Sequence, residues 1–261
     1  MAKLSPFAIW GIVKELRVAA EDTRPLVVSG PLATQLAKEL TRGGNPNAVR
    51  VDGRVEDAAL LVRILGGAPT EDDVRVLKAA KRAGITALVV QTGAEDVDVP
   101  YVLPTDAVKV PPGSGFPVEE IAALIAARLG EAGSGLAARL PVVREPLSEW
   151  LIERFSRQNA IIGVAVWVPG ADFAVLTLNQ LRLVLRLAAA HGIEIDQQRL
   201  PEVVATVGAG LGFRAVARQL LGAVPVAGWL VKGGVAYVGT RALGEAAQRY
   251  FQAVSQRAHT A

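Results

Sequence analysis

The pattern of apolar and polar positions divides the chain into two parts. From residue 25 to residue 130, short apolar runs alternate with segments of helical periodicity, whereas residues 147–258 are helical in pattern almost throughout. Residues 131–146 are rich in glycine and alanine and then bounded by prolines, which is typical of a linker. Residues 1–24 predict a short helix packed on the first domain rather than a signal peptide.

In the first part, strands separated by helices predict a parallel sheet that is covered on both faces. The predicted strands are 26–28, 49–51, 58–65, 85–90 and 99–103, and the predicted helices are 32–40, 70–82 and 118–129. Thr70 is the expected N-cap of the second helix, with Asp73 at the capping-box position and Gly84 as its end. The expected fold class is therefore α/β followed by all-α.

The second part predicts four helices, at about 147–166, 170–190, 200–221 and 226–256. Glycine and alanine are frequent in them, and Ala236, Thr240 and Gly244 recur every four residues. Small side chains at this spacing let helix backbones approach closely, in bilayers especially. Pro225 directly precedes the last predicted helix and Gly228 falls in its first turn, and we take them with Thr240 and Gly244 as structural or interaction candidates.

The helix predicted at 170–190 combines a long apolar stripe with a few polar groups. Asp172 falls near its N-terminus, where a carboxylate stabilises the positive end of the helix dipole. Helical spacing puts five residues on one, largely polar face: Asp172, Val175, Asn179, Arg182 and Arg186. Gln180 lies within the apolar stripe and favours a hydrogen bond to a neighbouring helix; a recognition point for a partner or lipid is the alternative.

Composition narrows the chemistry. The chain has no cysteine and only two histidines, far apart, so neither a metal site nor a histidine-based catalytic site is expected. The net charge of +3 is too small to indicate nucleic-acid binding. Basic and acidic residues are equal in number up to Arg144, so the whole excess falls in the apolar C-terminal part, where it favours anionic lipid headgroups.

The hydrophobic content of 51% and mean hydropathy of +0.33 are high for a soluble protein. A membrane span needs about 20 mostly apolar residues. The longest stretches without a charged residue in the second part are 158–171 and 219–231, and each contains a proline. We therefore expect a tight hydrophobic bundle, or hairpins lying in the membrane interface, rather than a simple span.

In a parallel α/β fold, ligands bind at the carboxyl ends of the strands. The loop after the first predicted strand reads Ser29-Gly30-Pro31 and lacks the GxxxxGK[ST] pattern, including the lysine that binds phosphate. Ser29 and Gly30 are weak candidates for phosphate, and Asp96, after the fourth strand, is a weak candidate for a guanine edge. No cofactor is expected, and the chain is not expected to be an enzyme.

The second part resembles the DUF697 (YcjF-like) family, over about residues 145–252. The matching residues are Pro169-Gly170-Ala171-Asp172, Gln180, Ala188–Ile193, Val224–Gly228, Thr240–Glu245 and Tyr250-Phe251. The first part is similar to the GTPase-like domain of those proteins with its nucleotide motifs eroded, since Gln91-Thr92-Gly93-Ala94 replaces the guanine motif. The resemblance implies a pseudo-GTPase fold followed by a hydrophobic helical domain, without the activity.

The sequence thus predicts a non-catalytic, membrane-associated scaffold or regulatory protein on the cytoplasmic face of the membrane. The expected partners are a protein that the sequence does not name, a membrane surface and a second copy of the chain. Two alternatives remain open: a nucleotide-binding switch with a non-standard phosphate loop, and a soluble, cytoplasmic homo-oligomer whose apolar helices bury a subunit interface.

Overall fold

The computed structural model describes residues 22–93, 97–165, 171–193 and 229–260, together with Gly11 and Lys14. The chain forms two compact units. The α/β domain comprises Asp22–Leu147, and the helical domain comprises Ser148–Ala261 with Met1–Glu21. The helix predicted in residues 1–24 lies almost wholly outside the described residues, as do the predicted helix 200–221 and the candidates Asp96, Pro225 and Gly228.

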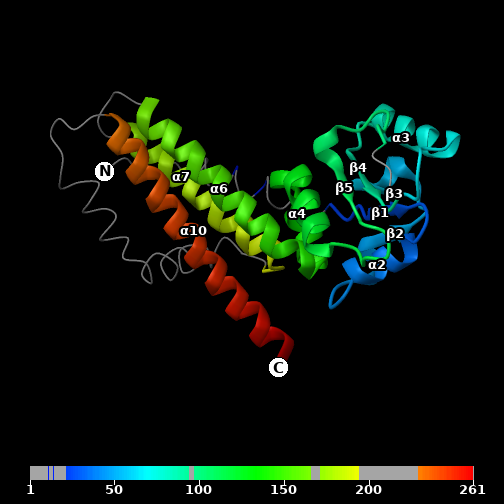
Figure 1. The fold of residues 1–261 in the computed structure, drawn as a ribbon. Helices are drawn as coiled ribbons and strands as arrows, with labels where there is room; N and C mark the ends of the chain where they lie inside the picture. The colour runs from blue at the N-terminus through cyan, green and yellow to red at the C-terminus, as the bar shows by residue number, and fades with distance from the viewer. Residues whose placement is uncertain are drawn as a thin grey trace. The chain divides into compact units, whose positions relative to one another are not determined.

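The α/β domain contains a five-stranded sheet in the order β2-β1-β3-β4-β5, with every neighbouring pair parallel (Figure 1). The strands are β1 (Leu26–Ser29), β2 (Val49–Val51), β3 (Leu60–Leu65), β4 (Ala87–Gln91) and β5 (Ala107–Lys109). β1 and β3 are buried along their whole length, as their apolar sequences require, because a parallel sheet is covered on both faces. This confirms the parallel α/β domain expected from the sequence.

Helices cover the two faces of this sheet, with α3 on one side and α2 on the other (Figure 1). Val27, Leu61 and Val89 point from three adjacent strands onto Leu77 and Ala80 of α3. On the opposite face, α2 contacts β1, β2 and α4. The helices of this domain are α2 (Ala33–Leu40), α3 (Glu71–Ala83), α4 (Val118–Leu129), α5 (Ser134–Arg139) and the start of α6 (Pro141–Ala165), with short 3-10 turns η1 (Pro46–Ala48), η2 (Val55–Asp57), η3 (Pro104–Asp106) and η4 (Gly130–Gly133).

The ends of α3 are those that the sequence predicts. Thr70 accepts a hydrogen bond from the Asp73 amide, and the Asp73 carboxylate accepts one from the Thr70 amide, which completes the capping box. Gly84 ends the helix in the left-handed conformation.

The predicted strand 99–103 is wrong, and the fifth strand is β5, four residues further along the chain. Val99 is buried against the α3 face, so its apolar character reflects packing rather than strand pairing. Prolines at 100 and 104 flank the segment and have no amide hydrogen to donate to a ladder.

Residues 131–146, expected to form a linker, are helical instead and belong to the α/β domain. Leu136, Leu140 and Val143 are fully or almost fully buried. The Arg139 guanidinium donates hydrogen bonds to the carbonyl oxygens of Thr23 and Arg24, which fixes the chain ahead of β1. The high glycine and alanine content suggested a linker, but the apolar residues of this segment recur at helical spacing and form one buried face.

The described part of the helical domain is a bundle of α6, α7 (Ala171–Ala190) and α10 (Trp229–Thr260). Side-chain contacts fix the directions of the helices. Gln180 meets Thr240 and His191 meets Phe251, so α7 and α10 run parallel. Asn159 meets Thr240 and Ile152 lies against Gly244, so α6 runs antiparallel to α10. The last turn of α6 and the first turns of α7 and α10 therefore lie at the same end of the bundle (Figure 1).

The polar face predicted for α7 is only partly exposed. Val175, near the start of the helix, is exposed, but Arg186, three turns later, is 5% exposed. Asn179 donates a hydrogen bond to Asn159 of α6. The polar residues of this face thus contribute to the interior of the bundle, because α7 is surrounded more closely toward its C-terminus.

Candidate functional site

The carboxyl edge of the sheet is the first place to look for a ligand site, since β1 and β3 lead to helices on opposite faces there. The loops after these strands lie against each other. A Cβ atom on Gly30 would lie 2.3 Å from the carbonyl oxygen of Ile64 in β3, and one on Gly66, after β3, would lie 3.8 Å from Pro31 Cγ. A Cβ on Gly93, after β4, would lie 3.1 Å from the carbonyl oxygen of Gly66. The described parts of the loops after β1, β3 and β4 therefore approach one another closely at this edge.

Backbone amides in the loop after β1 already donate hydrogen bonds within the chain. The amide of Ala33 donates to the carbonyl oxygen of Gly30, and the amides of Gln35 and Leu36 donate to that of Leu32. Leu32 has a φ of 62° and precedes α2 without a side-chain cap. A phosphate loop works by pointing several free amides at the ligand. Here those amides bond within the loop and the first turn of α2.

Beneath α3, the sheet carries a buried ion pair that sequence reasoning did not single out. Arg63 of β3 donates to Asp73 at 2.8 Å and to Asp72 at 2.8 Å. Burial alone would raise the pKa of Asp73, but hydrogen bonds from Thr70 and Arg63 outweigh it and hold that pKa below its ordinary value. The pair joins β3 to the first turn of α3, and its partners satisfy each other, so its role is structural. The sequence signal was a lone arginine in an apolar strand, followed by an acidic helix start.

Two further polar atoms at this edge, Ser29 Oγ and Gln91 Oε1, are buried without a hydrogen-bond partner. They do not converge, because β3 lies between their strands. Gln91 donates its amide hydrogen to the carbonyl oxygen of Val97, so its side chain holds the loop after β4. Of the weak nucleotide candidates, Ser29 and Gly30 thus lie in a closed edge, and Asp96 lies outside the described residues.

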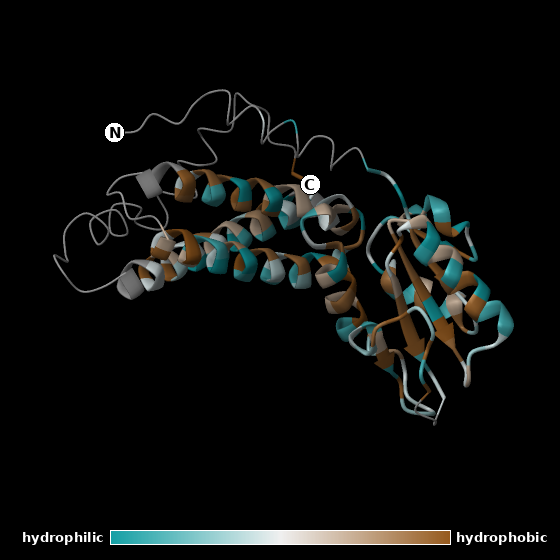
Figure 2. Ribbon diagram, turned by 90° about the horizontal axis from the view of Figure 1, so that it is seen from above, coloured by the Kyte–Doolittle hydropathy of each residue, from teal (hydrophilic) through white to brown (hydrophobic). Residues whose placement is uncertain are grey.

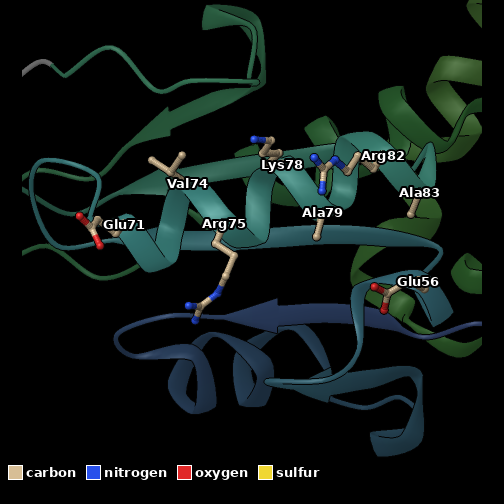
Figure 3. Close-up of a pocket in the computed structure, with 8 residues that line it drawn as sticks. All are labelled: Glu56, Glu71, Val74, Arg75, Lys78, Ala79, Arg82 and Ala83. Atoms are coloured by element: carbon tan, nitrogen blue, oxygen red, sulfur yellow. The ribbon is translucent and has the colours of Figure 1, made fainter.

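An open hollow of about 690 Å³ lies on the flank of α3 rather than at the carboxyl edge (Figure 3). Seven of its eight lining residues come from α3, and Glu56 comes from η2. Its charged side chains are all exposed: Glu56, Glu71, Arg75, Lys78 and Arg82. An active site brings buried polar groups together around a substrate. This hollow lacks that feature and is the charged outer surface of a helix.

The helical domain contains a polar cluster that links its three helices. Thr240 Oγ1 accepts hydrogen bonds from Asn159 Nδ2 at 2.7 Å and from Gln180 Nε2 at 3.3 Å. Asn159 Oδ1 in turn accepts from Asn179 Nδ2 at 3.1 Å. Asn159 and Thr240 are completely buried. Gln180 therefore has the partner on a neighbouring helix that its position favoured. Asn159, which the sequence analysis did not identify, follows the polar residues Ser156–Gln158 and precedes an apolar run, so nothing in the sequence set it apart.

The remaining candidates have structural positions. Asp172 is the second residue of α7, at the N-terminal end where a carboxylate was expected. Gly244 packs against α6 and α7, since a Cβ there would lie 2.7 Å from Ile152 and 3.1 Å from Leu183. Within the described residues, no group of three or more histidines, cysteines, aspartates or glutamates could hold a metal ion. The described parts of both domains thus show packing and polar networks rather than a reaction centre.

A search for membrane spans within the described residues finds one stretch that is long and apolar enough by length and composition, Val118–Arg139. It covers α4, η4 and α5 of the α/β domain, and half of its most apolar window is buried in the fold. Ile121 and Ile125 of α4 belong to the buried core. This stretch is therefore explained as core of the α/β domain.

Comparison with protein-family models and with curated proteins gave no match to the chain.

Proposed function

We propose that the chain is a non-catalytic, membrane-associated scaffold or regulatory protein. Its α/β domain is a degenerate GTPase-like domain that binds a protein partner, and its helical domain associates with the membrane. The observation that carries the non-catalytic part is the closed carboxyl edge, where Gly30 lies against Ile64 and Pro31 against Gly66. Active α/β domains bind their ligands in a crevice at this position, and here the loops after β1 and β3 approach each other closely.

The GTPase-like origin rests on the parallel sheet, on the loop that leads from β1 into α2, and on the resemblance of the second part to DUF697. Fold-level likeness supports ancestry better than activity. Ser29–Leu36 contains no lysine followed by a serine or threonine, which a phosphate loop needs, and the amides of Ala33 and Gln35 bond within the chain. Such a domain retains a surface that binds a protein partner, although it no longer binds a nucleotide.

Membrane association is supported by the high apolar content and by the excess of basic residues in the C-terminal part. It is also supported by exposed apolar side chains in the helical domain: Ile161 is 66% exposed and Val238 is 64% exposed. Exposed apolar surface in a helical domain indicates a further contact with lipid or protein.

Two experiments on the full chain test the proposal. Titration calorimetry with GTP, GDP and ATP at millimolar concentration is expected to give no binding heat; a saturable signal would support the alternative of a nucleotide switch. Flotation with vesicles that contain anionic lipid is expected to carry the protein with the lipid. A protein that stays in the aqueous fraction and forms a compact oligomer by light scattering would favour the soluble homo-oligomer instead.

A further inference from the structure

Charged residues are distributed unevenly along the axis of the helical bundle. We call the end formed by residues 158–165, 171–181 and 229–240 the apolar tip. Its only charged residues are Asp172 and Lys232. These two residues carry opposite charges. The apolar tip therefore carries no net charge.

The exposed side chains change in character where the apolar tip ends. Among described residues of the apolar tip, the exposed ones are all apolar or glycine: Ile161, Val164, Ala165, Val175, Gly234 and Val238. In the rest of the bundle, the exposed residues include one glutamate and five arginines: Glu149, Arg154, Arg157, Arg241, Arg249 and Arg257. Exposed apolar residues and exposed charged residues both occur on α6 and on α10, so the change depends on the position along the bundle and not on which helix is considered.

A belt of ion pairs marks the boundary. Glu153 on α6 accepts hydrogen bonds from Arg157 and from Arg241 of α10, and Arg241 also bonds Glu245. Tyr237 lies on the tip side of this belt and donates its hydroxyl to Glu153 at 2.7 Å. Tyrosine has an apolar ring and a polar hydroxyl group. A tyrosine next to arginines is the arrangement found at the boundary between hydrocarbon and lipid headgroups.

Exposed apolar residues come from all three helices: Ile161 from α6, Val175 from α7 and Val238 from α10. In a three-helix bundle, the outer faces of the helices point in different directions. A protein partner that docks in a groove would cover one side, whereas a surrounding apolar medium would cover all three. At 1.5 Å per residue the apolar tip is roughly 15 Å long on α7 and α10, which matches one leaflet of a hydrocarbon core about 30 Å thick.

We infer that the apolar tip inserts end-on into one leaflet of an anionic bilayer, with the belt of Glu153, Arg157, Arg241 and Glu245 at the headgroups and Tyr237 directly beneath it. This inference rests on the proposed membrane association and specifies its contact. The arginines of the belt, Arg157 and Arg241, face the lipid phosphates. Asn159 and Thr240 are buried inside the bundle, and the half-buried Asn179 and Gln180 donate hydrogen bonds to them, which lowers the cost of bringing these polar groups into the hydrocarbon region.

The chain has no cysteine, so single cysteines can be labelled without background. Three full-length variants, Ile161→Cys, Val238→Cys and Tyr250→Cys, would carry the environment-sensitive fluorophore NBD. Tyr250 is the matched control, since it is exposed on the same helix as Val238 but lies beyond the belt. On addition of phosphatidylcholine vesicles with about one-quarter phosphatidylglycerol, NBD at 161 and 238 is expected to shift to the blue and to brighten about twofold or more, while NBD at 250 changes little.

The outcomes separate this inference from the proposed function. Flotation with the vesicles but no change of NBD at 161 and 238 would overturn end-on insertion and leave membrane association standing. Neither flotation nor an NBD change would overturn both. NBD that is already shielded at 161 and 238 before vesicles are added would show the apolar tip covered by the chain itself or by a second copy, and would also overturn insertion.

A charge placed in the apolar tip gives an independent readout. Val238→Asp is expected to weaken vesicle binding about tenfold or more, because a charge in the hydrocarbon region opposes insertion. The matched variant Tyr250→Asp should bind vesicles as the unaltered protein does. Circular dichroism checks that both variants keep their helical content. Equal binding by folded Val238→Asp and Tyr250→Asp would contradict the inference.

Discussion

The close packing of α10 on its neighbours predicts opposite effects for the same substitution at two glycines of that helix. A Cβ at Gly244 would lie 2.7 Å from Ile152 Cγ1 and 3.1 Å from Leu183 Cδ2, whereas a Cβ at Gly234 would meet nothing within 4 Å. Ile152 is 3% exposed and Leu183 is fully buried, so neither side chain has room to move. Gly244→Ala and Gly234→Ala are therefore matched in chemistry and in secondary structure and differ only in packing.

The magnitudes follow from two opposing terms. Replacing glycine with alanine inside a helix stabilises the fold by about 1 kcal/mol. Forcing a methyl group into a closely packed site costs about 1–3 kcal/mol, and three contacts under 3.3 Å place Gly244 toward the upper end. Gly234→Ala should thus raise the free energy of unfolding by about 1 kcal/mol. Gly244→Ala should lower it by about 1–2 kcal/mol.

Urea unfolding followed by tryptophan fluorescence measures this effect in the right domain. All four tryptophans, at positions 10, 150, 167 and 229, belong to the helical domain, so the signal reports that domain alone. Combining Gly244→Ala with Ile152→Ala should destabilise by less than the sum of the two single changes, because the clash disappears with the isoleucine. If Gly244→Ala proved as stable as Gly234→Ala, the close approach of α6 and α10 would be refuted.

Three further substitutions test the other networks. Thr240→Val removes the oxygen that accepts the hydrogen bond of the buried Asn159 amide, without changing side-chain volume. In the same urea assay it should lower the free energy of unfolding of the helical domain by about 1–3 kcal/mol. An unchanged urea midpoint would show that the polar cluster does not stabilise the bundle. Asp73→Asn removes a carboxylate whose pKa is depressed, so the stability that it contributes is present above about pH 4 and is lost as the pH falls through its folded pKa. In thermal melts by circular dichroism, the variant should be less stable at pH 7 and lose less stability than the parent below pH 4; parallel pH profiles would contradict this. Gly30 has a φ of 99°, and a Cβ there would clash with Ile64, so Gly30→Ala should clearly destabilise the α/β domain. Gly43 has a φ of 69° and open space around it, so Gly43→Ala is the control and should lower the free energy of unfolding by only about 1 kcal/mol. Hydrogen exchange of the sheet amides measures both effects, and an equal loss of protection in the two variants would contradict the close packing at Gly30.

The elements that could be predicted from the sequence are those whose signals are local. The capping box of Thr70 and Asp73, the stop at Gly84 and the whole of Val118–Leu129 are in the structure where the sequence predicts them. These signals act within one helical turn, so neighbouring residues suffice to read them. The alternation of strands and helices likewise determined that the sheet is parallel.

Contacts between residues that are far apart in the sequence could not be predicted, because they depend on how the helices and loops pack. Asn159 and Thr240 are 81 residues apart, and their hydrogen bond depends on how α6 packs on α10. Apolar and polar residues are interleaved along the long helices of the chain (Figure 2). Composition alone therefore did not reveal which residues of the segment 131–146 face inward. The closed edge at Gly30, the burial of Arg186 and the apolar tip all depend on helix packing and loop closure, which local periodicity does not encode.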